Sequence, residues 1–260
     1  MAKTCVALLA VLLLCTSLAT ATATATAVAP RSAPPVDVDL DYQLGGASTP
    51  AENVGIVVRD RKARPAPGVW NVCYVNGFQT QPDEKAFWRK RPGLLLRHRG
   101  RPVLDTAWGE RLLDIRTPAK RRKLAGIVGR WVEGCARRGF DAVEFDNLDS
   151  FSRSRGLIKA GQAKRFARLI VRRAHHAALP AAQKNWAQFN GRKVGFDFAI
   201  SEECGRYGEC GDYVRHYGRA VLAIEYRQRD FEKACAGYGE KLPIVLRDRA
   251  LAPDGPRSWC

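Results

Sequence analysis

The residues best suited to acid–base chemistry lie in one short segment, residues 139–151. Four carboxylates fall within nine positions there: Asp141, Glu144, Asp146 and Asp149. Apolar residues are threaded between them, and residues 142–145 have the pattern of a short buried strand that leads into the acids. Carboxylates at the carboxyl end of a buried strand are what acid–base catalysis on a barrel scaffold requires. A calcium loop and an acid-rich helix start are the alternatives, and the strand pattern favours catalysis.

Polar side chains also follow the other predicted strands. In chain order they are Asp60, Tyr74, Asn76, Asp146, Asn147, Lys184, Asn185, Glu202, Glu203, Glu225, Tyr226 and Asp248. Each of them alone is more often a structural polar group. Because the carboxyl ends of barrel strands meet at one mouth, their recurrence at seven successive strand ends predicts a single site.

Aromatic residues accompany these polar groups and suggest the kind of ligand. The candidates are Tyr42, Trp70, Trp108, Trp186 and Tyr207, some of which would serve only as core or rim packing. Aromatic faces stack on sugars, and paired carboxylates cleave glycosidic bonds. The sequence shows no glycine-rich phosphate loop and no Ser–His–Asp arrangement, and His175 and His176 fall on a predicted solvated helix face. A two-carboxylate mechanism is therefore the natural expectation.

The elements that must position these residues alternate between strand and helix. Strand patterns cover residues 41–44, 54–58, 69–75, 142–145, 181–184, 196–200, 220–224 and 243–246, and helical patterns cover 118–138, 159–178, 213–218 and 230–237. Eight strands with interleaved helices predict an α/β fold, a single (β/α)8 TIM-type barrel. The first two connections are short for helices, so a flavodoxin-like open sheet is the alternative. The apolar run 112–115 is assigned to an elaborated loop.

The amino-terminal residues predict export. Residues 1–29 have the charge, apolar run and small-residue tract of a secretory signal peptide, and the apolar run is too short for a membrane span. A lipoprotein site at Cys15 is the alternative, which the preceding Leu14 disfavours. Residues 30–38 then read as a linker, and 39–260 as one (β/α)8 domain. We expect a secreted, soluble monomer.

Six cysteines remain beyond the signal: Cys73, Cys135, Cys204, Cys210, Cys235 and Cys260. An even number in an exported chain suggests three disulfides, although six cysteines allow 15 pairings. Proximity in the chain suggests a staple between Cys204 and Cys210 and a second link between Cys235 and the terminal Cys260, which leaves Cys73 for Cys135. Zinc is the alternative, but no Cys-x2-Cys pair or suitably spaced histidine is present, so we expect no metal and no cofactor.

The chain is strongly basic, with a formal net charge of +17. Basic residues cluster at positions 89–101, 120–123, 153–159 and 172–173. Such clusters bind nucleic acid or an anionic cell-envelope polymer. Because they are scattered over the chain, we interpret them as a solvated surface with some affinity for an anionic matrix, not as a specific nucleic-acid site.

From about Tyr42 to Asp248 the chain resembles the endo-α-1,4-polygalactosaminidase family, glycoside hydrolase family 114. The segments that carry the resemblance are 139–147, 200–204 and 207–210, supported by 42–44, 110–116, 184–185 and 223–226. The resemblance implies a barrel that cleaves α-1,4-linked galactosamine or N-acetylgalactosamine polysaccharide internally, with Asp146 and Glu202 as the catalytic carboxylates. The family usually has proline at the position of Phe145, and often Asn and Gln at those of Ser201 and Glu203, which leaves the exact substrate open.

A two-carboxylate mechanism needs one protonated and one ionised group. We assign Glu202 as the general acid, with a pKa raised by Glu203 and by burial. Asp146, hydrogen-bonded by Asn147 or Lys184, would be the nucleophile or the base, and the reverse assignment is equally compatible with the sequence. A catalytically silent carbohydrate-binding barrel, a basic secreted protein that binds anionic polymers and a metal-dependent hydrolase are the competing hypotheses.

Overall fold

The computed structural model describes Met1 and residues 33–260. The predicted signal peptide and the first part of the predicted linker lie outside the described residues. The strands are β1 (Asp39–Gln43), β2 (Val54–Asp60), β3 (Trp70–Asn76), β4 (Arg97–His98), β5 (Arg101–Pro102), β6 (Leu104–Asp105), β7 (Glu110–Arg111), β8 (Ala142–Asp146), β9 (Ala181–Lys184), β10 (Phe198–Glu202), β11 (Val221–Glu225), β12 (Ile244–Arg247) and β13 (Arg257–Trp259). The helices are α1 (Lys85–Arg89), α2 (Pro118–Arg137), α3 (Ala160–His176), α4 (Cys204–Tyr207), α5 (Cys210–Tyr217) and α6 (Gln228–Tyr238), with 3-10 turns η1 (Pro82–Glu84), η2 (Pro92–Leu94), η3 (Ser150–Arg153) and η4 (Gly191–Val194).

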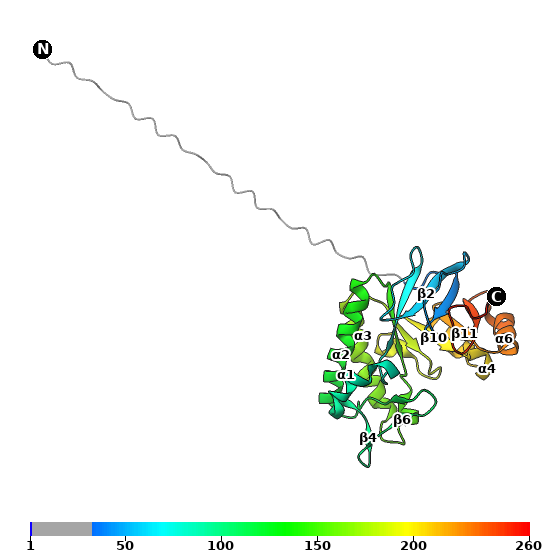
Figure 1. Cartoon of the computed structure of the whole chain (residues 1–260). Helices are drawn as coiled ribbons and strands as arrows, with labels where there is room; N and C mark the ends of the chain where they lie inside the picture. Colours follow the sequence, from blue (N-terminus) through cyan, green and yellow to red (C-terminus); the bar gives the residue numbers. More distant parts are fainter. Residues whose placement is uncertain (2–32) are drawn as a thin grey trace.

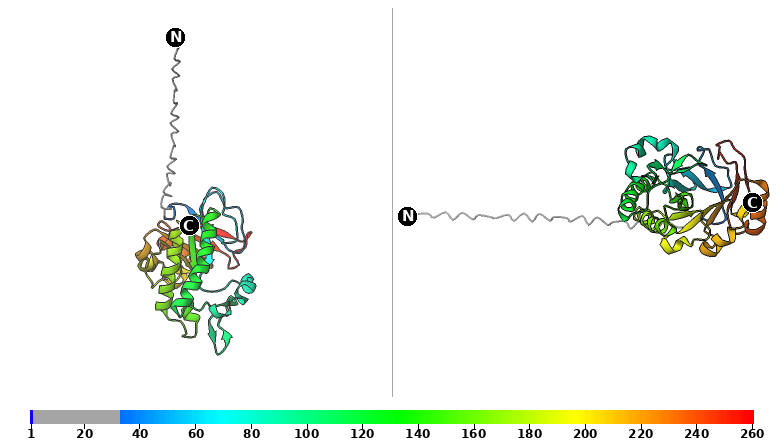
Figure 2. Two further views of the ribbon diagram at one scale, coloured as in Figure 1. Left: turned by 90° about the vertical axis from the view of Figure 1, so that its left-hand side faces the viewer. Right: turned by 90° about the horizontal axis from the view of Figure 1, so that it is seen from below.

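The strands form a nearly closed barrel (Figure 1). The order is β1-β2-β3-β8-β9-β10-β11-β12, with every neighbouring pair parallel. Seen from below, the strands run round a ring, with α2 and α3 outside one side and α6 outside the opposite side (Figure 2, right). The predicted (β/α)8 barrel is therefore confirmed. As the short spacings indicated, the connections 44–53 and 61–69 contain no helix in the described chain.

Alternation of side chains along each strand separates two cores, because successive residues of a strand point to opposite faces. The barrel interior holds small and large apolar residues such as Leu40, Ile56, Ala142 and Ile200. The outward residues pack under α2, α3, α5 and α6 in a larger cluster, which contains Phe145. Polar residues that share the inward phase therefore collect inside the barrel, toward the carboxyl ends of its strands.

The seam between β12 and β1 is closed by side chains around Asp41. Arg247 donates to the Asp41 carboxylate at 2.7 Å, and Arg257 of the antiparallel strand β13 donates to its other oxygen at 2.9 Å. Trp259 donates its indole N–H to the carbonyl of Leu40 at 2.7 Å. Both Asp41 and Arg247 are fully buried. One carboxylate thus links the last two strands to the first.

Three disulfides and one helix cap add local constraints. The bonds join Cys73 to Cys135, Cys204 to Cys210, and Cys235 to Cys260, the pairing that chain proximity suggested. The side chain of Thr117 accepts the backbone N–H of Lys120 and caps the start of α2. The run 112–115 lies in the long β3–α2 connection, as expected. Within the described residues, no helix combines the length and the hydropathy that crossing a membrane requires.

Replacing Asp41 with Asn should destabilise the barrel strongly, because it removes the charge that neutralises a fully buried arginine. Breaking a buried ion pair on one side costs about 3–5 kcal/mol. Urea denaturation followed by circular dichroism measures this loss. The control is Asp39→Asn on the same strand, where the carboxylate accepts an exposed hydrogen bond from Asn53 and the cost should stay below about 0.5 kcal/mol. Equal losses in the two variants would contradict the seam's role.

Candidate active site

A cavity of about 940 Å³ opens at the carboxyl ends of the strands. Seven carboxylate residues line it, Asp105, Glu110, Asp146, Asp149, Glu202, Glu203 and Glu209, against three cationic ones, Arg153, Lys184 and Arg249. Its aromatic lining consists of Tyr74, Trp108, Phe151, Trp186, Tyr207, Tyr213 and Tyr226. The wall of this cavity is thus acidic and aromatic, although the protein as a whole carries a net charge of +17.

Asp146 and Glu202 face the same buried ammonium group. The Nζ of Lys184 lies 3.4 Å from Glu202 Oε2 and 3.9 Å from Asp146 Oδ1. Asp146 ends β8 and Glu202 ends β10, and both have the inward phase of their strands. Their side chains remain 18% and 28% exposed, respectively, so both are open to a ligand in the cavity. The structure thus brings Asp146 and Glu202 together in one cavity.

Lys184 is held from below by a second, fully buried layer. Its Nζ donates to Glu144 Oε1 at 2.8 Å and to the hydroxyl of Tyr42 at 2.6 Å, and that hydroxyl donates to the same Glu144 oxygen at 2.8 Å. Glu144 precedes Asp146 by two residues and therefore points to the same face of β8. The ammonium is thus surrounded by Glu144, Asp146 and Glu202, which together with Tyr74 raise its pKa well above the usual range, although burial acts in the opposite direction.

The two catalytic candidates differ in their electrostatics. Burial alone would raise the pKa of Glu202, but Lys184 and hydrogen bonds from Tyr226 and Asn185 outweigh it and hold this pKa below its usual value. Burial raises the pKa of Asp146, and the charge of Glu202 adds to that rise against the effects of Lys184 and Tyr74. The expected rise in the pKa of Glu202 is therefore wrong.

The reason lies in the position of the neighbouring Glu203. Its carboxylate accepts hydrogen bonds from Arg206 at 2.6 Å and from Arg249 at 2.7 Å, so two arginines neutralise it. Glu202 instead accepts a short hydrogen bond from the Tyr226 hydroxyl, and the Asn185 side chain bonds both its backbone N–H and its carboxylate. These partners favour the ionised form of Glu202.

Backbone strain collects directly after three of these strands. Asn147, Asn185, Trp186 and Glu203 all have positive φ, between 54° and 65°. The left-handed region costs a non-glycine residue about 1–2 kcal/mol, less for asparagine, and such residues cluster where function requires a special geometry. Here the turn of the chain after each strand aims Asp146, Lys184 or Glu202 at the cavity.

A polar network braces the wall beside Asp146. The backbone N–H of Asn147 donates to Asp146 Oδ1 at 2.7 Å, and the Asn147 side chain bonds Asn76 at 3.1 Å. Asn76 in turn donates to Glu110 at 2.9 Å. Burial raises the pKa of Glu110 to about 7. The β6–β7 hairpin thus supplies the cavity with a carboxyl that titrates near neutral pH.

Most of the predicted ligand-binding residues do line the cavity. They are Tyr74, Trp108, Asn147, Lys184, Asn185, Glu203, Tyr207 and Tyr226. Tyr42 and Asn76 lie beneath it in the hydrogen-bonded layers described above. Glu225 is also fully buried and accepts the backbone N–H of Gly205 at 2.7 Å, so it holds the start of α4 in place.

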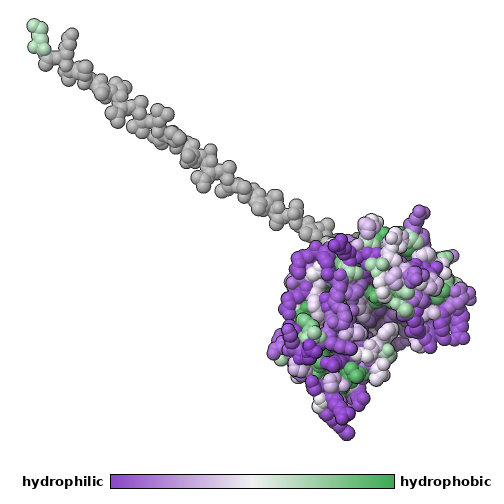
Figure 3. All heavy atoms as spheres, viewed as in Figure 1, coloured by the Kyte–Doolittle hydropathy of each residue, from purple (hydrophilic) through white to green (hydrophobic). Residues whose placement is uncertain are grey.

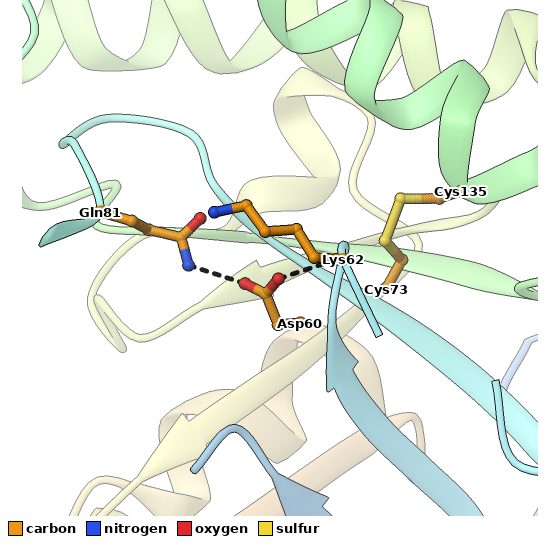
Figure 4. The surroundings of a disulfide bond; sticks show 5 residues. All are labelled: Asp60, Lys62, Cys73, Gln81 and Cys135. Carbon is orange, nitrogen blue, oxygen red and sulfur yellow. Dashed lines mark hydrogen bonds between the residues drawn. A yellow bond between two sulfur atoms is a disulfide. The ribbon is translucent and has the colours of Figure 1, made fainter. Parts of the chain in front are cut away.

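Three predicted residues lie elsewhere. Asp60 bonds Gln81 and the backbone of Lys62, beside the Cys73–Cys135 disulfide, and does not line the cavity (Figure 4). Asp248 accepts the backbone N–H of Ala252 and orders its own loop. Trp70 begins β3, and its ring packs edge-on against Phe198, the first residue of β10, at the amino end of the barrel. The strand that contains Trp70 was predicted correctly. Trp70, however, lies at its amino end and not at the carboxyl end that faces the cavity.

Sequence reasoning did not assign several lining residues to the site. Asp105 and Glu110 come from the long β3–α2 connection, Arg153 from η3, and Arg249 from the loop after β12. Loop residues carry no periodicity that would mark their direction. Two sequence segments near these residues had been noted: 110–116 for the family resemblance and 139–151 for its carboxylates. Neither identified these residues as part of the cavity lining.

Comparison with known proteins agrees with this geometry. The profile of glycoside hydrolase family GH114 matches residues 19–260. The chain belongs to this family. It is accordingly a glycosidase, and the resemblance noted in the sequence is confirmed. No curated protein sequence matches the chain.

Solved structures with similar folds include three carbohydrate-related proteins at low sequence identity. Ega3 from Aspergillus fumigatus, solved in complex with galactosamine, has a TM-score of 0.72 and 19% identity, over 88% of this chain and 98% of that one. The glycoside hydrolase domain of PelA from Pseudomonas aeruginosa has a TM-score of 0.58 and 17% identity, over 85% and 98%. A maltogenic α-amylase, AmyB from Thermotoga neapolitana, has a TM-score of 0.51 and 11% identity, over 81% and 67%. At these identities the likeness of the GH114 chain to them is one of fold.

Replacing Lys184 with Met should raise the pKa of both Asp146 and Glu202, because the nearest positive charge is lost while burial and mutual repulsion remain. Carboxyl carbon NMR over a pH titration measures this directly, without a substrate. The titration of Glu202 should move upward in pH. Lys123→Met, which removes an exposed lysine of α2, should leave it unchanged. An unshifted Glu202 in the folded Lys184→Met protein would contradict the proposed coupling.

Proposed function

We propose that this glycosidase is a secreted endo-acting enzyme that cleaves α-1,4-linked galactosamine polysaccharide through Asp146 and Glu202. The observation that carries the proposal is the convergence of these two carboxylates on Lys184 in one open cavity. Glycoside cleavage needs two carboxyl groups on either side of the scissile bond. Secretion is supported by the sequence pattern of residues 1–29.

The charge of the cavity supports an amino sugar as the substrate. Of the seven lining carboxylates, Asp146 and Glu202 share the single charge of Lys184. Among the described residues Glu110 forms no ion pair, and the Glu209 carboxylate bonds only the side-chain amide of Gln188. Galactosamine without an acetyl group carries a positive amine, which such a wall attracts. The local field of the cavity thereby overcomes the repulsion that a protein of net charge +17 exerts at long range.

The size and rim of the cavity support cleavage within a chain. Its volume of about 940 Å³ lies near the top of the range of about 300–1,000 Å³ that is usual for ligand pockets, so it accommodates more than one sugar. Trp108 and Tyr207 line it and are 63% and 61% exposed. Exposed aromatic rings of this kind offer stacking surfaces for sugars beyond the two that are joined by the scissile bond.

The reaction requires one carboxyl to protonate the leaving oxygen while the other attacks the anomeric carbon or activates water. Water then supplies the hydroxyl of the new reducing end. Tyr74 donates to Asp146 at 2.8 Å, and Tyr226 donates to Glu202, so each carboxylate keeps a fixed orientation. Lys184 limits the repulsion between them before substrate binds. This arrangement raises the pKa of Asp146 and lowers that of Glu202 from their usual values.

Asp146→Asn and Glu202→Gln should each reduce cleavage of galactosamine oligomers by at least about 10²–10⁴-fold, since each removes a proton-transfer or nucleophilic group. Release of reducing ends measures cleavage, and calorimetry measures binding, which both variants should keep. Asp60→Asn is the matched control, because this carboxylate lies outside the cavity. An unmodified protein that binds the oligomers without releasing reducing ends would instead be a silent carbohydrate-binding barrel.

The acid and nucleophile roles can be separated with alanine variants, azide and oligomers that carry an activated leaving group. If the reaction retains configuration, azide should rescue the alanine variant of the nucleophile with a glycosyl azide of inverted configuration, and that of the acid–base residue with one of retained configuration. Analysis of the product anomers identifies which of Asp146 and Glu202 has each role. No rescue of either variant, together with an inverted product from the unmodified enzyme, would show a single displacement by water.

Oligomers with free amines should be cleaved faster than fully acetylated ones of equal length, and added salt should shrink the difference, because screening weakens the attraction to the acidic wall. Glu110→Gln should also reduce this difference in cleavage rate, because the substitution removes one carboxylate from the wall. Comparison of kcat/KM at two ionic strengths tests this. A preference for acetylated oligomers that does not change with salt would contradict amine recognition.

A further inference from the structure

A second, basic pocket lies beside the acidic cavity. Its volume is about 350 Å³, and its lining consists of Lys164, Arg168, Gln188, Phe189, Asn190, Lys193, Val194 and His216. Gln188 also lines the acidic cavity, so the two hollows are neighbours. No carboxylate residue lines the basic pocket. The two hollows therefore have opposite charge.

Three exposed cations line this pocket, and contacts within the protein position two of them, Lys164 and Arg168. The Lys164 ammonium lies 4.7 Å from the centre of the Phe189 ring and 5.3 Å from that of Trp186. Arg168 donates to the backbone carbonyl of Lys193 at 3.2 Å. Among the described residues, none of these three side chains forms an ion pair with a carboxylate. Like charges that converge in this way repel one another, and a bound anion would relieve that repulsion.

The surroundings extend the positive charge. Helix α3 carries Lys164, Arg165, Arg168, Arg172 and Arg173 and has no acidic residue. Lys164, Arg168 and Arg172 are spaced four residues apart and therefore lie along one face of the helix, which leads to the pocket. The helices α2 and α3 face the viewer in Figure 2, left, and the surface over them in Figure 3 is mostly hydrophilic.

We propose that this basic pocket binds an acidic sugar unit of an anionic polysaccharide that runs along α3. The volume suits one sugar ring, the amides of Gln188 and Asn190 suit hydroxyl groups, and the apolar floor of Phe189 and Val194 suits the ring body. Single-stranded nucleic acid is disfavoured, because it needs exposed aromatic rings for base stacking. The large exposed aromatics of the described chain are Trp108 and Tyr207, which belong to the acidic cavity.

Binding at the basic pocket does not depend on which reaction the acidic cavity catalyses. A polymer of acidic sugars would hold the protein in a matrix, while the acidic cavity stays free for a cationic chain. Carboxylate- and phosphate-bearing sugars share the chemistry that the pocket recognises, since lysine and arginine bind both groups. The two kinds of polymer can be distinguished by direct binding.

The test uses the whole protein and three defined ligands of equal length: an oligomer of galacturonate, a phosphate-bearing glycan and a neutral oligomer. The pocket variant combines Lys164→Gln, Arg168→Gln and Lys193→Gln. The control combines Arg122→Gln, Lys123→Gln and Arg130→Gln, which removes three exposed charges from the neighbouring helix α2. Calorimetry gives the dissociation constants, and thermal unfolding confirms that both variants fold.

One of the two anionic oligomers should bind the unmodified protein, and the pocket variant should weaken it at least about tenfold, because charge-assisted contacts are lost. The control should weaken it by no more than about twofold through long-range charge alone. The tighter anionic oligomer identifies the source. Equal weakening by both variants, binding of neither oligomer, or tighter binding of double-stranded DNA at equal charge would overturn the proposal. Cleavage of galactosamine oligomers should be unchanged in both variants.

Discussion

The arrangement of the cavity depends on one buried ammonium group. Lys184 is surrounded by Glu144, Asp146 and Glu202, with its nitrogen 2.8 Å, 3.9 Å and 3.4 Å from their nearest oxygens. Carboxylates this close in a buried site cannot all stay ionised without a counter-charge. Tyr42, which is hydrogen-bonded to Glu144, accepts from the same ammonium at 2.6 Å. The same lysine therefore bonds one oxygen of the buried Glu144 and lowers the pKa of the two carboxyls exposed to a ligand, against the effect of burial.

The barrel makes this arrangement possible because side chains alternate along its strands. Tyr42, Glu144 and Lys184 point inward from three different strands and meet in one layer, and Asp146 and Glu202 point inward in the layer above. The hydrogen-bonded register fixes the relative height of neighbouring strands, so residues distant in sequence arrive at matching levels. Asp41 closes the seam between the last strands and the first, and its two arginines keep β1, and with it Tyr42, in place.

Periodicity and strand-end polarity were sufficient to predict the barrel, the strand at residues 181–184 and a polar site at the strand ends, whereas the choice of Asp146 and Glu202 as a pair came from the family resemblance. They failed where direction depends on tertiary contacts. Asp60 ends a strand but turns to Gln81, and Glu203 follows Glu202 but turns to Arg206 and Arg249 through a left-handed backbone. The lining residues Asp105 and Glu110 come from a long connection without a repeating pattern. The pKa of Glu202 depends on Tyr226 and Lys184, 24 and 18 positions away in the chain, so no local pattern predicts its direction.

The same alternation explains why two departures from the usual family residues, Phe145 and Ser201, lie outside the lining of the cavity. Phe145 stands between Glu144 and Asp146, so it points outward, where it is fully buried and packs near Phe196. Ser201 stands likewise between inward-facing neighbours on β10. Substitutions at outward positions change the packing under the helices, whereas the inward positions keep both carboxylates and the lysine. Differences among members in substrate should therefore arise from the loops that form the rim, such as the β6–β7 hairpin with Trp108, because these can vary without moving the strand ends.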